Sequence, residues 1–168
     1  MSEDFRIEVD TKLVDQFIDK LEEAPELVEK HMTAAMDASL DLLVNWTVDG
    51  TPVNLGLLRG SWTKEVTGTP QNLTGEMMTP LVYGWPVETG RKPGKQPPVD
   101  AIELWVKRKL GAGADSRQIA WAIARHIAIH GTEGAHMVET AYNRAKSGNE
   151  IAKVWEYEID AFLKELAA

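Results

Sequence analysis

The segment from residue 51 to residue 98 constrains the fold most, because its sequence pattern differs from the helical pattern on either side. It is rich in Gly, Pro and Thr and carries short alternating apolar runs, which are typical of strands and turns. We expect strands at 62–67 and 73–78. The five residues 68–72 between them predict a hairpin loop longer than the two-residue type.

A third strand is expected in the same segment, with four apolar residues sharing one face: Leu81, Tyr83, Trp85 and Val87. Pro86 lacks an amide donor, so this strand should lie at an edge of the sheet or carry a bulge. The following run, 90–98, combines glycines, prolines and cations, which predicts an exposed loop.

The first fifty residues predict a short strand and two helices. Phe5, Ile7 and Val9 alternate with polar residues, as in a half-buried strand. Asp10 or Thr11 can cap a helix over 13–21, and Pro25 marks a break followed by a second helix. That second helix should end near Asp49 and Gly50, with an apolar stripe formed by Val28, Met32, Ala35, Ser39, Leu42 and Trp46.

The last seventy residues return to helical spacing. One helix opens at Pro97 and Pro98 and ends at Gly111. Asp115 and Gln118 form a capping-box pattern for the next helix, which stops at Gly131. Two more helices are expected over 135–148 and from 151 to the end of the chain. The fold class is therefore α+β, as a single domain with three parts: 1–50 (strand and helices), 51–98 (small antiparallel sheet and loop) and 99–168 (C-terminal helices).

The composition excludes several classes of protein. A chain of 168 residues suits one domain with a substantial core. The absence of cysteine rules out disulfides, thiolate chemistry and cysteine-based zinc sites. No apolar run approaches the roughly 20 residues of a spanning helix, and the N-terminus is acidic rather than signal-like. We expect a soluble protein made in the cytoplasm, with no membrane partner.

A net charge of -8 argues against a general phosphate-binding surface, which needs clustered Lys and Arg. The cations are nevertheless uneven. Arg91, Lys92 and Lys95 crowd one loop, and the run 107–109 ends a helix. These cations suit either a solvated loop with a favourable helix C-terminus or a docking site for an acidic partner.

Histidines offer the best candidates for chemistry. His126 and His130 lie four residues apart on a predicted helix, with His136 nearby, so the three could ligate a metal. The zinc-protease motif, however, requires a glutamate where this chain has Ile127. His130 precedes a glycine stop, where a cationic imidazole is favoured. His31 suits the boundary of a core better than a metal site.

Other catalytic patterns are absent from the sequence, including the nucleophile elbow, the phosphate loop and the dinucleotide fingerprint. We therefore expect no enzymatic activity, no catalytic residues, no cofactor and no metal site. Two alternatives stay open: a small histidine-based, metal-dependent hydrolase resting on the three histidines, and a DNA-binding accessory module resting on the loop and helix cations.

Six tryptophans are many for a chain of this size. Most fall within apolar patterns and suit a core. Trp62 and Trp85 lie beside Pro/Gly turns in a small sheet that cannot hide both of its faces, so one of them is a candidate interface anchor. An edge strand would also offer unpaired amides to a neighbouring copy in a ring.

Two phrases of the central segment carry a resemblance. The first, Pro-Val-x-x-Gly-x-Leu-Arg-x-Ser, spans 52–61, and the second runs from a tyrosine strand at Tyr83 into Val-Glu-x-Gly at 87–90. With the segments 105–111, 120–127, 130–137 and 141–142, they resemble the neck or tail-completion family of long-tailed bacteriophages of the siphovirus type. The similarity covers roughly residues 25 to 145. At Asn54 and Leu55 the chain departs from the family, whose members often have a threonine and a second glycine-type turn there.

The resemblance implies a structural virion protein, a minor tail or head-tail joining component located in the neck of the particle. It implies a ring, with six copies matching the symmetry of the tail, between the head connector or adaptor proteins and the tail terminator or tail-tube protein. DNA would pass through an acidic lumen without specific binding. The interface residues expected for such a ring are Arg59, Trp62, Tyr83, Trp85, Arg91, Lys92 and Lys95.

Overall fold

The computed structural model describes residues 18–20, 22 and 24–167. The predicted strand at Phe5, Ile7 and Val9 and the cap at Asp10 or Thr11 lie outside the described residues, as does most of the first predicted helix. The described chain is α+β, as predicted, with helices and a two-stranded antiparallel sheet. Its elements are α2 (Pro25–Gly50), β1 (Thr63–Thr69), β2 (Asn72–Met78), α3 (Gly84–Thr89), α4 (Val99–Leu110), α5 (Ser116–His130), α6 (Met137–Ser147) and α7 (Glu150–Ala167).

The chain divides into two compact units. Unit 1 comprises Met1–Leu40, Glu65–Glu76 and Asn149–Ala168, and unit 2 comprises Asp41–Lys64 and Met77–Gly148. Both α2 and β1 therefore contribute residues to each unit. The expectation of a single domain with three sequential parts stays a prediction.

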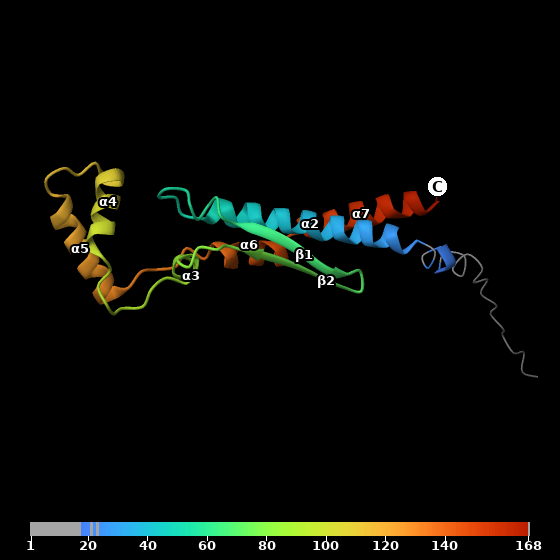
Figure 1. Cartoon of the computed structure of the whole chain (residues 1–168), viewed down its shortest axis with the longest axis horizontal. Coiled ribbons are helices and arrows are strands. Elements are labelled where there is room, and N and C mark those ends of the chain that lie inside the picture. The colour runs from blue at the N-terminus through green and yellow to red at the C-terminus, as the bar shows by residue number, and fades with distance from the viewer. Residues whose placement is uncertain (1–17, 21, 23, 168) are drawn as a thin grey trace, which may run out of the picture. The chain divides into compact units, whose positions relative to one another are not determined.

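In unit 1, α7 runs beside α2 (Figure 1). Gly75 of β2 lies against the α2 side chains of Met36 and Leu40. Pro25 opens α2, where its missing amide costs no hydrogen bond. Ala35 and Leu40 are buried, and Ser39 satisfies its hydroxyl by donating to the carbonyl of Ala35 at 2.7 Å. The six residues of the predicted apolar stripe are all buried or half-buried.

In unit 2, α4 and α5 pack against each other as a helical hairpin (Figure 1). Val106, Ala120 and Ala124 are fully buried, and the two alanines let the helix backbones approach closely. Gly111 ends α4 in the left-handed conformation, as the sequence predicted. Met137 of α6 is 1 % exposed and packs against the backbone of Gly50 at the end of α2.

The third predicted strand is wrong: the chain forms the short helix α3 there. Pro86 is the third residue of this helix. A helix leaves its first amides without internal partners, so the proline ring costs nothing at this position, although it would interrupt a strand ladder. The backbone amide of Val87 then donates to the carbonyl of Tyr83 at 3.2 Å.

The predicted hairpin loop is too long. The strands continue through Thr69 and resume at Asn72, leaving a two-residue turn of Pro70 and Gln71. Gly68 permits this with a φ of +104° and without a Cβ, which would overlap the carbonyl oxygen of Asn72. The glycine that suggested a loop is therefore what lets the two strands close tightly.

The predicted capping box at the start of α5 is also wrong. Asp115 is the N-cap residue, but its backbone is in the right-handed helical region and its side chain caps no amide. A capping side chain normally requires an extended backbone at this position. Ser116 instead donates its hydroxyl to the Glu103 carboxylate at 3.3 Å, which ties the start of α5 to α4.

Candidate assembly surface

The Val-Glu-x-Gly phrase at 87–90 leads into backbone pairing with the segment 131–136. The amide of Arg91 donates to the carbonyl of Thr132 at 2.9 Å, and the amide of Thr132 donates back at 2.8 Å. A Cβ on Gly131 would overlap the carbonyl oxygen of Arg91. Two of the phrases that carry the resemblance therefore lie together in unit 2.

Glu88 has a structural role at this junction. Its carboxylate accepts hydrogen bonds from the amides of Val138 at 2.9 Å and Glu139 at 3.0 Å. These are two of the amides that the first turn of α6 leaves without helical partners. The negative charge also lies at the positive end of the helix dipole. Glu88 therefore caps α6 from a distant part of the chain.

The other central phrase, 52–61, forms a compact turn. The amide of Gly60 donates to the carbonyl of Gly56 at 2.9 Å, and the hydroxyls of Ser61 and Thr79 lie 2.6 Å apart. Leu58 is buried, at 5 % exposure. This leaves the side chains of Leu55 and Leu57 directed to solvent, at 60 % and 62 % exposure.

Further apolar side chains of unit 2 are exposed around α3. Val82 is 92 % exposed, and Trp85 is 74 % exposed. Tyr83 is 45 % exposed. Exposed tryptophan and tyrosine are among the side chains that most often anchor protein interfaces.

Three neighbouring cavities connect this part of the surface. The first lies between the 52–58 turn and Trp105, with a volume of about 340 Å³. It shares Tyr83 and Val87 with a second cavity of about 510 Å³. A third cavity adjoins the second through Arg91 and Thr132, and Trp85 and Lys92 contribute to its wall. We call the surface formed by Leu55, Leu57, Tyr83, Trp85, Arg91 and Lys92 the assembly surface.

The structure brings four of the seven predicted interface residues together, because Tyr83, Trp85, Arg91 and Lys92 line these connected cavities. The guanidinium of Arg91 also donates to the carbonyl of Lys95, which folds the loop back on itself. Lys92 and Lys95 are exposed.

The other three predicted interface residues, Lys95, Arg59 and Trp62, line none of these three cavities. Arg59 lies 3.5 Å from an Asp49 carboxylate oxygen, in an exposed pair. Trp62 is half-buried and donates its indole N–H to the hydroxyl of Thr51 at 3.2 Å. Trp62 therefore has an intramolecular partner, unlike the outward-facing Trp85.

The histidines do not converge on one point. His126 and His130 stack along α5 with ring centroids 4.4 Å apart. His136 belongs to the α6 N-terminus and lies 2.8 Å from the Glu139 carboxylate. Within residues 18–20, 22 and 24–167, no three His, Asp or Glu side chains are grouped so that they could hold a metal ion.

An ion-pair cluster joins α4 to α5. A single guanidinium nitrogen of Arg117 contacts Asp100 at 2.6 Å and Glu103 at 2.8 Å, and Lys107 contacts Glu103 at 2.8 Å. Hydrogen bonds from Lys107 and Arg117 lower the pKa of Glu103 to about 2. The hydrogen bonds to Asp100 and Glu103 raise the pKa of Arg117. This cluster fixes the hairpin rather than forming a site for a ligand.

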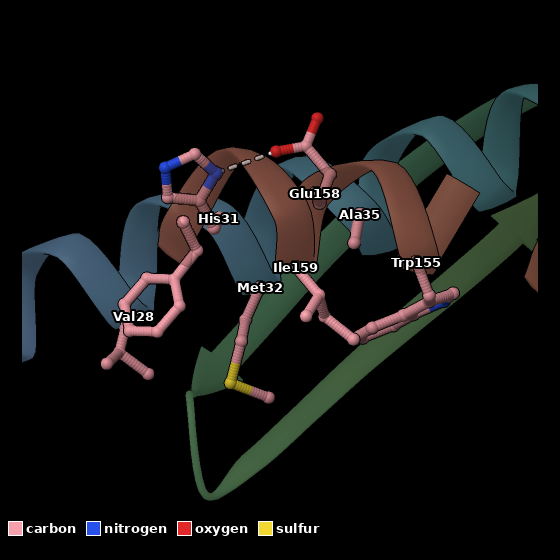
Figure 2. Close-up of a pocket in the computed structure, with 8 residues that line it drawn as sticks. Val28, His31, Met32, Ala35, Trp155, Glu158 and Ile159 are labelled. Atoms are coloured by element: carbon pink, nitrogen blue, oxygen red, sulfur yellow. Dashed lines mark hydrogen bonds and ion pairs between the residues drawn. The ribbon is translucent and has the colours of Figure 1, made fainter. Parts of the chain in front are cut away.

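A separate apolar cavity of about 200 Å³ lies in unit 1, between α2 and α7. Figure 2 shows Met32 and Ala35 of α2 and Trp155 and Ile159 of α7 around it. At its edge, Nδ1 of His31 lies 2.8 Å from a Glu158 carboxylate oxygen. We call this cavity the α2–α7 pocket; its full lining is Val28, His31, Met32, Ala35, Trp155, Glu158, Ile159 and Phe162.

Sequence reasoning missed the α2–α7 pocket and the role of Glu88. The apolar pocket residues of α7, Trp155, Ile159 and Phe162, recur at three- and four-residue intervals, which predicted a helix but not a pocket, and α7 contains no buried residue. A helix whose stripe is amphipathic to its end is the signal that could have suggested an uncovered groove. Nothing in the local sequence of Glu88 indicates that it caps a helix some fifty residues later.

Comparison with protein-family models, curated proteins and solved structures finds no significant match. Among the helices that the structure describes, none combines the length and apolar composition needed to cross a bilayer.

Proposed function

We propose that this protein is a structural component of a tailed-phage virion, which forms a ring at the neck or head-proximal end of the tail. The observation that carries the proposal is the assembly surface. It presents exposed aromatic and aliphatic side chains beside two cations, on a framework built from the phrases that resemble the neck family. Such a surface suits protein contacts better than catalysis.

The framework of the surface supports this proposal. The segments 52–61, 83–90 and 130–137 form two hydrogen-bonded turns and a helix cap. The exposed side chains project from these segments. Residues of these segments therefore position interface side chains without taking part in chemistry. This is the arrangement expected of a component whose task is to join other proteins.

In the proposed ring, DNA passes through the lumen without binding specifically to its wall. Each copy carries a net charge of -8, so six copies would repel phosphates on average. Its partners are the head connector or adaptor on one side and the tail terminator or tail tube on the other.

Mixing the purified protein with connector subunits and with tail-tube subunits tests this function. We expect a stable complex with at least one of them, resolved by size-exclusion chromatography with light scattering. The double variant Leu55→Ser, Leu57→Ser should weaken the complex, whereas the control Leu104→Ser, on the exposed side of α4, should not. Indifference to both partners, or tight binding of duplex DNA in their place, would contradict the proposal.

A further inference from the structure

The net charge of the chain conceals a separation of charge between the two units. Among the described residues, unit 1 holds 12 Asp and Glu against 4 Lys and Arg, a net charge of -8, whereas unit 2 holds 8 against 12, a net charge of +4. Unit 2 of one copy is therefore attracted to unit 1 of another, and two acidic units repel each other. This favours head-to-tail contacts, which form a ring when the rotation between successive copies closes, over a contact between identical surfaces.

Trp85 is the most prominent anchor that unit 2 offers. Its side chain is 74 % exposed, and it shares a cavity wall with Arg91 and Lys92. Pro86 follows it within α3 and restricts the backbone that carries the indole. An aromatic ring beside two cations, on a fixed backbone, is typical of the side chains that dominate binding energy at interfaces.

The α2–α7 pocket of unit 1 is complementary to this anchor. Its volume of about 200 Å³ lies below the roughly 300 to 1,000 Å³ of pockets for small molecules, and it suits a single large side chain. Its interior is apolar: Met32 and Ile159 line it (Figure 2), as does Phe162.

The two helices that form the pocket carry carboxylates. Glu158 lies at its edge, paired with His31, and Glu165 of α7 pairs with Lys30 of α2 at 2.8 Å. Glu29 and Glu156 are exposed on the same two helices. The hydrogen bond from Lys30 lowers the pKa of Glu165, so this carboxylate stays ionised at neutral pH. Two cations beside an entering indole would therefore meet negative charge.

We propose that Trp85 of one copy inserts into the α2–α7 pocket of the next copy, with Arg91 and Lys92 facing the carboxylates around it. The inference rests on the proposed function, because it specifies the contact from which the ring is built. Each copy offers one anchor and one pocket, so the contact is directional, and successive copies add until the ring closes.

Two variants test the anchor and the pocket of this contact separately. Trp85→Ala removes the anchor and leaves the pocket intact. Ile159→Arg fills the pocket mouth with a long cation and leaves the anchor intact; since Ile159 is 51 % exposed, the new side chain can reach solvent and the fold is retained. Matched controls are Trp121→Ala, on α5 at 51 % exposure, and Tyr157→Arg, on α7 at 71 % exposure. Circular dichroism checks that all four variants are folded.

The expected result in sedimentation velocity is that each of the two variants alone self-associates roughly thirtyfold more weakly than the unaltered protein. Mixed in equal amounts, they form a one-to-one dimer and nothing larger, because only one anchor and one pocket in each pair can meet. The two controls assemble like the unaltered protein.

The other outcomes distinguish this contact from the function on which it rests. If both variants form rings as the unaltered protein does, the proposed contact is overturned, whereas the proposal that the protein forms a ring is supported. If they form rings but no longer bind connector or tail-tube subunits, the pocket receives one of those proteins and the proposed contact is overturned. If the unaltered protein stays monomeric at low salt, both the contact and self-assembly into a ring are overturned.

Discussion

At the scale of single residues, the assembly surface depends on contacts that are distant in sequence. Gly131 was predicted correctly as a helix stop from its position after an apolar helical pattern. Its packing against Arg91 could not be predicted, because that contact depends on how two loops meet. The cap made by Glu88 was missed for the same reason: helix-cap patterns describe neighbours in sequence, and this carboxylate comes from another element.

Removing the Glu88 cap should destabilise the protein. Glu88→Ala leaves the amides of Val138 and Glu139 without their acceptor, so we expect the free energy of unfolding to fall by about 1 to 2 kcal/mol. Urea denaturation measures this change. The control Glu133→Ala removes an exposed carboxylate nearby and should change stability by less than about 0.5 kcal/mol. Equal stabilities of the two variants would show that the cap contributes nothing.

Replacing Gly131 should be more damaging. Its φ is +77°, and an added Cβ would overlap the carbonyl oxygen of Arg91. Gly131→Ala therefore combines backbone strain with a steric clash, and we expect a loss of at least about 2 kcal/mol in the free energy of unfolding. Gly113→Ala, where nothing lies within 4 Å, is the matched control. Urea denaturation measures this loss as well. An unchanged denaturation midpoint for Gly131→Ala would contradict the close packing of the two loops.

At the scale of elements, long periodic segments were predictable and the short one was not. The helices α2, α4, α5, α6 and α7 repeat apolar residues at helical spacing, and β1 and β2 alternate. In α3, only six residues long, alternation around Tyr83 and Trp85 suggested a strand. These side chains alternate without lining a buried face, since Trp85 is mostly exposed. Whether a short segment forms a strand or a helix depends on which of its side chains are buried, and the sequence of so short a segment does not show this.

The α4–α5 hairpin should lose stability in acid because of Glu103. Its pKa is lowered from 4.5 to about 2 by Lys107 and Arg117. A lowered pKa in the folded state means that the contribution is fully present above about pH 4.5 and is lost as the pH falls through about 2. We therefore expect the protection factors of amides in α4 and α5, which are corrected for the intrinsic exchange rate at each pH, to fall over this range.

A carbon NMR titration of the Glu103 carboxyl checks this expectation directly. In the Glu103→Gln variant, the acid-dependent part of the exchange should largely disappear, while the control Glu156→Gln, an exposed position on α7, should keep it. Titration of Glu103 near 4.5 would show that the cluster is not formed in solution.

At the scale of the whole molecule, the fold class follows from the sequence, but the distribution of charge between the two units does not. The described part of unit 1 is acidic and unit 2 is basic, and each unit is assembled from separate stretches of the chain. Knowing which stretches fold together is required before this separation can be seen. The separation provides a physical reason for one copy to associate with the next.

Association between unlike charged units should weaken as salt screens it. Ring formation is tested by the mass of the purified protein in solution, measured by multi-angle light scattering at low and high salt. We predict a closed assembly of about six copies at low salt that dissociates as the salt concentration rises, in keeping with the tail symmetry that the resemblance implies. A mass equal to one chain, 18.7 kDa, at every salt and protein concentration would contradict the ring.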